Sequence, residues 1–397
     1  MNQLKPNSEL IRIIQDKITQ SPQKRITFAE YMDLVLYHPK QGYYSSGVVE
    51  IGKAGDFFTA SSLGSDFGEL LAKQFLEMWE KLEQPTPFDL VEIGAGNGQL
   101  ANDILSYLSQ DHPQFLQSVQ YQIIESSPAL KQEQENRLKI WQEKGVTLSW
   151  KCWEEIPNES LVGCCFSNEL VDAFPVHRLQ VEAETLKEIY VTVSPPESDS
   201  PFTEISDEIS TPQLREYFQT VGISFSTSDY PDGFQTEVNL AMIPWLKTVS
   251  RCLKQGYLLT IDYGYTAEKY YHPQRDQGTL QCYVQHQRHN DPYFLIGKQD
   301  MTTHVDFTAL EIYGKQYDLE FLNFTQQALF LMALGLGDRL NSLSQGGFNV
   351  MEILQRRDAL HQLIDPMGLG GFGVLLQGKN LTSTQVSSLM GFQEDLS

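Results

Sequence analysis

The stretch Phe88-Asp-Leu-Val-Glu-Ile-Gly-Ala-Gly-Asn-Gly-Gln-Leu100 decides the fold class of this sequence. It begins with a short apolar run and then breaks into three glycines, Gly94, Gly96 and Gly98. A segment with apolar residues at helical spacing follows, up to about Leu108. A strand, a glycine turn and a helix in this order form a loop whose backbone can closely approach a bound nucleoside.

The spacing of the glycines indicates which nucleoside would bind. A dinucleotide-binding fingerprint, G-x-G-x-x-G, needs its third glycine where this chain has Gln99. The observed pattern is instead E-x-G-x-G-x-G, in which Glu92 stands at the end of the strand and Ala95 lies between the first two glycines. This pattern resembles the first motif of the class I methyltransferases that bind S-adenosyl-L-methionine. A tight turn without a ligand is the alternative.

A second short apolar strand, Tyr121-Gln-Ile-Ile-Glu125, supports the nucleoside interpretation. In a βαβ unit, an acid at the tip of the second strand can accept hydrogen bonds from both ribose hydroxyls. We therefore expect Glu125 and its neighbour Ser126 to lie at the cofactor.

Composition limits the class of partner. The chain has 397 residues and a formal net charge of −22 at pH 7. This length predicts one large domain with insertions, or two domains. The excess of acid repels phosphate backbones and no basic cluster offsets it, so we expect no nucleic-acid partner. A cationic substrate would suit this charge; acidity that only keeps the protein soluble is the alternative.

The cysteines and the N-terminal residues indicate a compartment. The five cysteines form neither a C-x-x-C pair nor a zinc-like spacing, so we expect reduced thiols and no metal site. Residues 1–24 show neither the apolar core of a signal peptide nor an Arg-rich transit pattern. No apolar window approaches the length of a membrane span, so none is expected. These features predict a cytoplasmic protein of bacterial type.

We group residues 1–84 as an N-terminal helical segment. Residues 6–20 have the pattern of an amphipathic helix, and Thr27 followed by Glu30 is a capping box that begins a second helix. The glycine-rich, aromatic stretch Gly52–Ala60 precedes a further predicted helix. Such a stretch could close over a cofactor as a lid, or could be a plain connector.

Residues 85–397 form the second predicted part, an α/β domain. In its first portion apolar strands alternate with helices, which predicts a parallel, doubly wound sheet. Two insertions, at about 180–235 and 265–305, interrupt this alternation. Two late strand candidates, 319–324 and 372–377, are joined by helical segments and match the reversed final strand of class I methyltransferases. We therefore expect a seven-stranded, mostly parallel, Rossmann-like sheet.

Candidate acceptor-binding groups follow the strand Gly163-Cys-Cys-Phe-Ser167. Ligands of an open parallel sheet bind at the carboxyl ends of its strands, where Asn168 and Glu169 are expected. The chain lacks the [NDS]-P-P-[YFW] motif of enzymes that methylate base amino groups, which disfavours those acceptors. Glu169 and Asp172 are three residues apart and would share one side of a helical turn. Such a pair suits a guanidinium; a helix-start acid and a solvated acid are the alternative.

Together these motifs resemble those of the mitochondrial dysfunction protein A family, which includes the mitochondrial complex I assembly methyltransferase. The likeness covers about residues 26–336. The motifs that carry it are Thr27-Phe-Ala-Glu-Tyr-Met32, Tyr37-His-Pro-Lys-Gln-Gly-Tyr-Tyr44, Gly55-Asp-Phe-Phe-Thr59, Glu92-Ile-Gly-Ala-Gly-Asn-Gly98, Ser167-Asn-Glu-Leu-Val-Asp-Ala-Phe-Pro-Val176, Ile261-Asp-Tyr-Gly264 and Gln299-Asp-Met-Thr-Thr-His-Val-Asp-Phe307.

The resemblance implies a class I methyltransferase that uses S-adenosyl-L-methionine and, further, methylation of an arginine in a protein. The acceptor could be a subunit of a respiratory-type complex. The residues expected at the cofactor are Glu92, Gly94, Ala95, Gly96, Gly98, Glu125, Ser126, Asn168, Gly55, Asp56 and Thr59. The residues expected at the catalytic site are Glu169, Asp172 and His304.

The role of His304 is the least constrained of these. The Thr303-His304 pair resembles a Thr-His-Trp loop of general protein arginine methyltransferases, with Val305 in place of the aromatic residue. His304 could orient a carboxylate or carry a proton, and a purely structural histidine is the alternative. For the whole chain, the alternatives are a non-catalytic assembly factor with a retained cofactor site and a small-molecule methyltransferase with the Tyr-rich second insertion as its lid.

Overall fold

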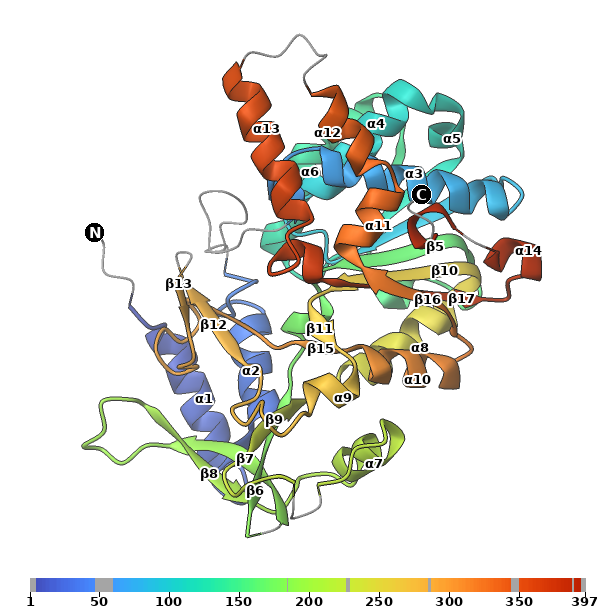
Figure 1. The fold of residues 1–397 in the computed structure, drawn as a ribbon. Helices are drawn as coiled ribbons and strands as arrows, with labels where there is room; N and C mark the ends of the chain where they lie inside the picture. The colour runs from blue at the N-terminus through green and yellow to red at the C-terminus, as the bar shows by residue number, and fades with distance from the viewer. Residues whose placement is uncertain are drawn as a thin grey trace. The chain divides into compact units, whose positions relative to one another are not determined.

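The computed structural model describes residues 5–46, 60–183, 185–225, 229–284, 287–343, 350–387 and 389–393. The chain divides into two compact units, each described here by itself (Figure 1). Unit 1 contains Met1–Phe57, Val171–Trp245 and Gly264–Ile312. Unit 2 contains Phe58–Leu170, Leu246–Tyr263 and Tyr313–Ser397.

Unit 2 is built on a seven-stranded sheet in the order β16-β17-β10-β5-β2-β3-β4. Neighbouring strands are parallel except at β17, which is antiparallel to both β10 and β16. The strands are β2 (Phe88–Ile93), β3 (Val119–Ile124), β4 (Thr147–Lys151), β5 (Leu161–Asn168), β10 (Leu253–Asp262), β16 (Glu320–Gln326) and β17 (Gly373–Lys379). The predicted fold class, an α/β class I methyltransferase fold with a mostly parallel seven-stranded sheet, is confirmed.

Strand β2 lies in the middle of this sheet, and every one of its residues is buried. A parallel strand covered on both faces is expected to be continuously apolar, as the run Leu90–Ile93 nearly is. Helix α4 (Gln99–Asp111) buries Leu100, Ile104, Leu105 and Leu108, at the spacing the sequence predicts. The glycine loop is therefore held between a central strand and a helix of the apolar core.

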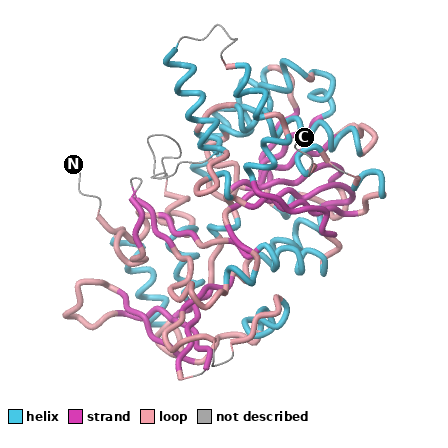
Figure 2. Tube along the Cα trace, in the orientation of Figure 1, coloured by secondary structure: helices cyan, strands magenta, loops and turns pink. Residues whose placement is uncertain are grey.

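The other helices of unit 2 complete its layers. In Figure 2 the magenta strands of this sheet lie beneath a group of cyan helices that includes α3, α4, α6 and α11 of Figure 1. The helices are α3 (Asp66–Lys81), α5 (Pro113–Ser118), α6 (Pro128–Glu143), α11 (Gln327–Ala333), α12 (Leu336–Ser342), α13 (Val350–Leu363) and α14 (Ser383–Val386). Two further helices, α8 (Met242–Cys252) and α10 (Phe307–Gln316), contain residues of both units.

Unit 1 contains a five-stranded antiparallel sheet in which β1-β7-β6-β9 follow one another and β8 pairs with β7. A three-stranded sheet, β13-β12-β14, and a two-stranded one, β11-β15, accompany it. The strands are β1 (Ile26–Thr27), β6 (His177–Glu182), β7 (Thr185–Val193), β8 (Phe202–Asp207), β9 (Gln235–Val238), β11 (Gly264–Tyr265), β12 (Gln281–Val284), β13 (Gln287–His289), β14 (Asp300–Thr302) and β15 (Val305–Asp306). The helices are α1 (Ser8–Gln20), α2 (Phe28–Tyr37), α7 (Gln213–Thr220) and α9 (Ala267–Tyr270).

The expected N-terminal segment and insertions map onto these units as follows. Both insertions, 180–235 and 265–305, fall within unit 1 together with the N-terminal helices. Residues 58–84, which the sequence analysis grouped with residues 1–57, lie in unit 2, because the apolar face of α3 packs in the same core as α4. The capping box of Thr27 and Glu30 is confirmed at the start of α2.

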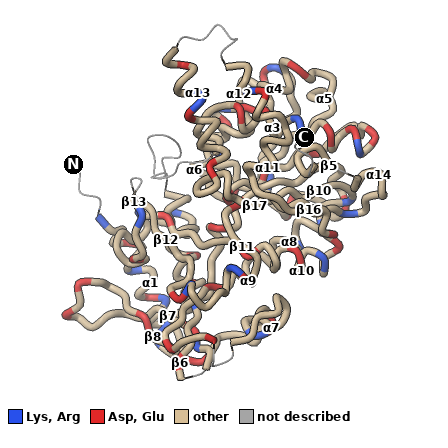
Figure 3. The backbone as a smooth tube through the Cα atoms, viewed as in Figure 1, with Lys and Arg blue, Asp and Glu red and all other residues tan. Residues whose placement is uncertain are grey.

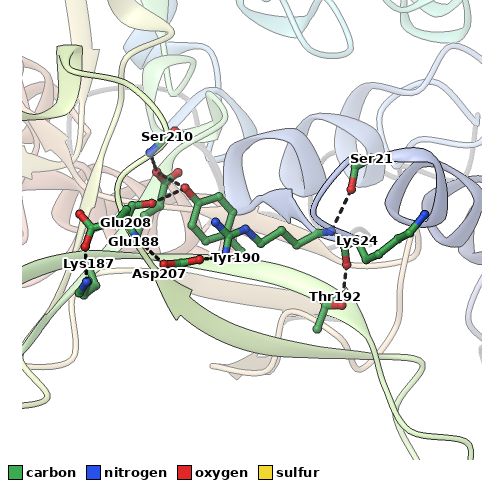
Figure 4. Close-up of polar contacts among 10 residues, drawn as sticks. Ser21, Lys24, Lys187, Glu188, Tyr190, Thr192, Asp207, Glu208 and Ser210 are labelled. Atoms are coloured by element: carbon green, nitrogen blue, oxygen red, sulfur yellow. Dashed lines mark hydrogen bonds and ion pairs between the residues drawn. The ribbon is translucent and has the colours of Figure 1, made fainter.

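A buried carboxylate holds strand β7 in unit 1. Glu188 has no exposed surface, and it accepts hydrogen bonds from Nδ1 of His177 (2.7 Å) and the backbone N–H of Ser210 (2.6 Å). The hydroxyl of Tyr190 also donates to it at 3.3 Å (Figure 4). Burial by itself would raise the pKa of Glu188, but the hydrogen bonds from His177 and Ser210 and the charge of His177 outweigh it and hold the pKa below its usual value.

Glu188→Gln should lower the free energy of unfolding by about 2 kcal/mol at pH 7, since the amide cannot serve all these donors as an acceptor. Because the folded-state pKa of Glu188 is lowered, its contribution is present above the unfolded pKa of about 4.3 and is lost as the pH falls through the folded value. Urea unfolding across this pH range measures the difference, with the exposed Glu197→Gln as control. If the difference in the free energy of unfolding between the wild type and Glu188→Gln grew as the pH fell, the lowered pKa of Glu188 in the folded protein would be contradicted.

Candidate active site

The glycine loop of unit 2 has a backbone that few other residues would allow. Gly94, Gly96 and Gly98 have φ values of +74°, +54° and +78°, in the left-handed region. A Cβ atom on Gly94 would lie 2.8 Å from Cδ1 of Leu170. The N–H of Gly98 donates to the carbonyl of Ala95 at 2.8 Å and closes a tight turn before α4. The loop therefore presents bare backbone at the end of β2.

An acid follows the neighbouring strand β3. Glu125 is partly exposed, and its Oε1 accepts the backbone N–H of Ser127 at 2.8 Å. Burial raises the pKa of Glu125, and the hydrogen bonds from Ser127 and Gln134 oppose that effect. Ser126 is exposed beside it. A carboxylate in this position, next to the glycine loop, can accept hydrogen bonds from the ribose hydroxyls of a nucleoside.

Gln134 of α6 connects this acid to the glycine loop and was not among the residues predicted from the sequence. Its Nε2 donates both to Oε2 of Glu125 (3.0 Å) and to the carbonyl of Gly96 (2.7 Å). Its Oε1 accepts the indole N–H of Trp150 at 2.9 Å. The side chain is fully buried. A glutamine in a polar helix gives no sequence signal of such a position, because its burial depends on β4, a strand whose position was not predicted from the sequence.

Glu92 lies inside the sheet rather than on its edge. Its carboxylate is buried and accepts the hydroxyl of Tyr121 at 2.7 Å. Burial raises the pKa of Glu92 to about 7, the charge of Glu125 adds to the effect, and the Tyr121 hydrogen bond opposes it. Glu92 therefore titrates near neutral pH, and its contact with a cofactor stays a prediction.

The segment after β5 differs from the expected helical turn. Glu169 has a φ of +52°, and its N–H donates to the carbonyl of Ile261 at 2.9 Å. A short 3₁₀ helix, η3 (Val171–Ala173), begins only after it. The prediction that Glu169 and Asp172 share one helical turn is therefore wrong, because this bond to β10 fixes Glu169 in a left-handed conformation.

Asn168 ends β5 beside Glu169. Its Nδ2 donates to Oε1 of Glu169 at 3.2 Å, and its Oδ1 is buried without a hydrogen-bond partner in the described part of the chain. Strands β3, β2 and β5 are adjacent and parallel, so Glu125, the glycine loop and Asn168 follow the same edge of the sheet. These residues fit an adenosyl nucleoside: bare backbone, a carboxylate for the ribose and an amide oxygen that still needs a donor.

Two of the expected catalytic residues, Asp172 and His304, belong to unit 1. The carbonyl of Asp172 accepts the N–H of Thr303 at 2.9 Å. The His304 ring stacks on Tyr265, with centroids 4.9 Å apart and planes 4° apart. Burial, followed by the charges of Arg275 and Arg288, lowers the pKa of His304 to about 4. His304 is therefore neutral at pH 7, which suits a hydrogen-bond partner better than a proton donor.

Three expected cofactor residues, Gly55, Asp56 and Thr59, lie outside the described residues. Within the described ranges no cluster of three or more His, Cys, Asp or Glu side chains could hold a metal ion. In those ranges, too, no helix has both the length and the apolarity that crossing a membrane requires.

Comparison with known proteins supports a site for an adenosyl cofactor. Residues 70–325 match a family model described as S-adenosyl-L-methionine-dependent methyltransferase. The protein arginine methyltransferase NDUFAF7 homolog, mitochondrial, of Drosophila melanogaster is 29% identical over 87% of this chain and 79% of its own. The corresponding NDUFAF7 protein of Rattus norvegicus is 28% identical over 80% of this chain and 72% of its own.

A solved structure extends the comparison to the whole fold. A protein from Burkholderia thailandensis, described as a likely methyl transferase and crystallised with S-adenosyl-homocysteine, superposes with a TM-score of 0.81. It is 27% identical to this chain, and the match covers 97% of this chain and 95% of that one. A native structure from the same organism gives a TM-score of 0.82 at 28% identity.

Proposed function

The chain belongs to the family of S-adenosyl-L-methionine-dependent methyltransferases, and we propose that it methylates the guanidinium of an arginine in a protein. The observation that carries the proposal is that relatives named protein arginine methyltransferases match over most of their own length. The net charge of −22 is consistent with a cationic acceptor. Figure 3 shows the Asp and Glu residues distributed along both units.

We propose the following roles for the residues of this chain. We propose that Glu125 accepts hydrogen bonds from the ribose hydroxyls of the cofactor. The cofactor would lie close to the backbone of Gly94, Gly96 and Gly98. The buried Oδ1 of Asn168 would accept a hydrogen bond from the cofactor. Glu92, Ala95 and Ser126 complete the proposed set, with Gly55, Asp56 and Thr59 retained from the family resemblance.

Methyl transfer needs an aligned nucleophile and the release of one proton. When bound, S-adenosyl-L-methionine supplies the methyl group on a positively charged sulfur. We propose that Glu169 and Asp172 contact the acceptor and that a carboxylate localises the guanidinium charge on one nitrogen. His304, neutral at pH 7, would orient a carboxylate through a hydrogen bond.

We also propose an acceptor protein and a cellular location. We retain a subunit of a respiratory-type complex as the acceptor, on the strength of the family resemblance. A cytoplasmic location also stays part of the proposal, while the two relatives named above are mitochondrial proteins.

Gln134→Leu should weaken binding of S-adenosyl-L-methionine by roughly fivefold, which corresponds to about 1 kcal/mol. The leucine cannot hold Glu125 and the Gly96 carbonyl in place, so part of the cofactor affinity is lost. Calorimetric titration measures the dissociation constant, with the exposed Gln132→Leu on the same helix as control. Equal affinities in the wild type and Gln134→Leu would show that this glutamine has no positioning role.

The acceptor class is tested by incubating the purified chain with methyl-labelled S-adenosyl-L-methionine and a protease-free cell extract. We expect label in the acid-precipitated protein. Label confined to small molecules in the supernatant would refute a protein acceptor.

A further inference from the structure

The three-stranded sheet β13-β12-β14 of unit 1 has two unlike faces. Cys282 and Met301 stand opposite each other in the register and are buried in the apolar core of unit 1. Side chains alternate between the faces of a strand, so the neighbours of these two residues point to the other face. That face, here called the polar face, carries Gln281, Tyr283, Asp300 and Thr302.

The polar face contains buried groups that lack partners. Thr302 is 2% exposed, and neither its Oγ1 nor the buried Oε1 of Gln281 has a hydrogen-bond partner among the described residues. Asp300 is fully buried, and its Oδ1 accepts the hydroxyl of Tyr44 at 2.7 Å. Unsatisfied buried polar atoms are uncommon in native proteins because each one costs free energy. A ligand with several N–H donors would satisfy them.

A second buried acidic residue lies beside the end of β14. Asp172 is 5% exposed, and its carbonyl accepts the N–H of Thr303, the residue that follows β14. Burial raises the pKa of Tyr44 well above its usual value, and the charges of Asp300 and Asp172 add to the effect. Burial and the same two acids raise the pKa of Tyr283, against the charge of Arg288. The charges of Asp172 and Asp300 therefore act on the hydroxyl groups of both Tyr44 and Tyr283.

Aromatic rings border these acids. The rings of Tyr37 and Tyr44 stack with centroids 5.5 Å apart and planes 27° apart. Arg288, opposite Tyr283 in the register, is exposed on the outer strand β13. The polar face and the residues beside it thus combine two buried carboxylates, Asp300 and Asp172, with two unsatisfied oxygens and the stacked rings of Tyr37 and Tyr44.

From this arrangement we propose that Asp300, together with Asp172, binds the guanidinium of the acceptor arginine on the polar face. This inference rests on the proposed function and adds a residue to it. A guanidinium is planar, has five N–H donors, pairs bidentately with carboxylates and stacks on aromatic rings. Thr302 and Gln281 supply the further acceptor oxygens. An ammonium has only three donors and no plane to stack, so it fits the face less well.

The test uses ethylguanidinium chloride as probe and the full-length chain with S-adenosyl-homocysteine present. Asp300→Asn should weaken probe binding at least tenfold, as measured by saturation-transfer NMR titration. The exposed Asp199→Asn changes the net charge equally and should leave the binding constant unchanged. Ethylammonium should bind the wild type at least tenfold more weakly than ethylguanidinium.

Thr302→Val provides a second variant that keeps the charge and the shape of the site. It removes an unsatisfied buried hydroxyl, so the melting temperature should stay the same or rise, while probe affinity should fall severalfold. Wild-type probe affinity in both Asp300→Asn and Thr302→Val would overturn the inference. So would an equal loss in Asp199→Asn, which would make the effect one of net charge.

Different experimental results would refute this inference and the proposed function. Methylarginine formed by the wild-type chain, with probe binding unchanged in both variants, refutes only the assignment of the polar face. Methylation of lysine alone, in the protein fraction, refutes arginine as the acceptor and the inference with it.

Discussion

Glu125→Ala should raise the dissociation constant for S-adenosyl-L-methionine about a hundredfold. The carboxylate follows β3, beside the glycine loop, and is held there by the N–H of Ser127 and the amide of Gln134. Two hydrogen bonds from ribose hydroxyls to a partly buried carboxylate together contribute roughly 3 kcal/mol, which is about this factor.

The measurement is calorimetric titration with S-adenosyl-L-methionine and S-adenosyl-homocysteine, which share the ribose and should lose affinity equally. Glu133→Ala, an exposed acid on α6, is the matched control and should bind both as the wild type does. Circular dichroism checks that Glu125→Ala is folded. A folded variant with unchanged affinity would place the ribose elsewhere in unit 2.

Asp172→Asn should lower kcat/KM for an arginine-containing acceptor about a hundredfold without changing the affinity for S-adenosyl-L-methionine. Asp172 is buried, and removing the charge of one partner in a buried pair costs about 2–5 kcal/mol. The amide would also lose the ability to localise the guanidinium charge. Because no proposed cofactor contact involves Asp172, cofactor binding should be retained.

The readout is the initial rate of label transfer to protein, measured together with a cofactor titration of the same preparation. Asp199→Asn serves again as the charge-matched control. Parallel losses of rate and cofactor affinity would mean that Asp172 acts on the fold or on the cofactor. A rate of label transfer equal to that of the wild type would show that Asp172 does not contact the acceptor.

The sequence predicted the parts of the fold that local chemistry determines. An apolar run broken by glycines produced β2, its loop and α4, because neither the strand nor the turn needs a distant partner to be recognised. The capping box at Thr27 is local in the same way. The reversed strand β17 was also recognised, because its length and its apolar residues identify a strand that helices separate from β16.

Residues whose role depends on distant segments could not be predicted. Glu169 appeared to start a helix, yet its bond to Ile261, far along the chain, fixes a left-handed conformation. Glu237 lies in β9, where its buried carboxylate accepts the N–H of Thr279, a residue 42 positions further along the chain. Asp300 and Gln134 look like ordinary polar residues until the pairing of β12 with β14 and the packing of α6 bury them.

The central claim is that this methyltransferase acts on arginine in a protein. It is tested most directly by identifying the labelled amino acid after transfer from methyl-labelled S-adenosyl-L-methionine to protein, complete acid hydrolysis and chromatography. The account predicts that the label co-elutes with methylated arginine and that its initial rate of appearance falls about a hundredfold when Asp172→Asn replaces the wild type at equal concentration. Label that co-elutes with methyl-lysine, or with no methylated amino acid, would contradict it.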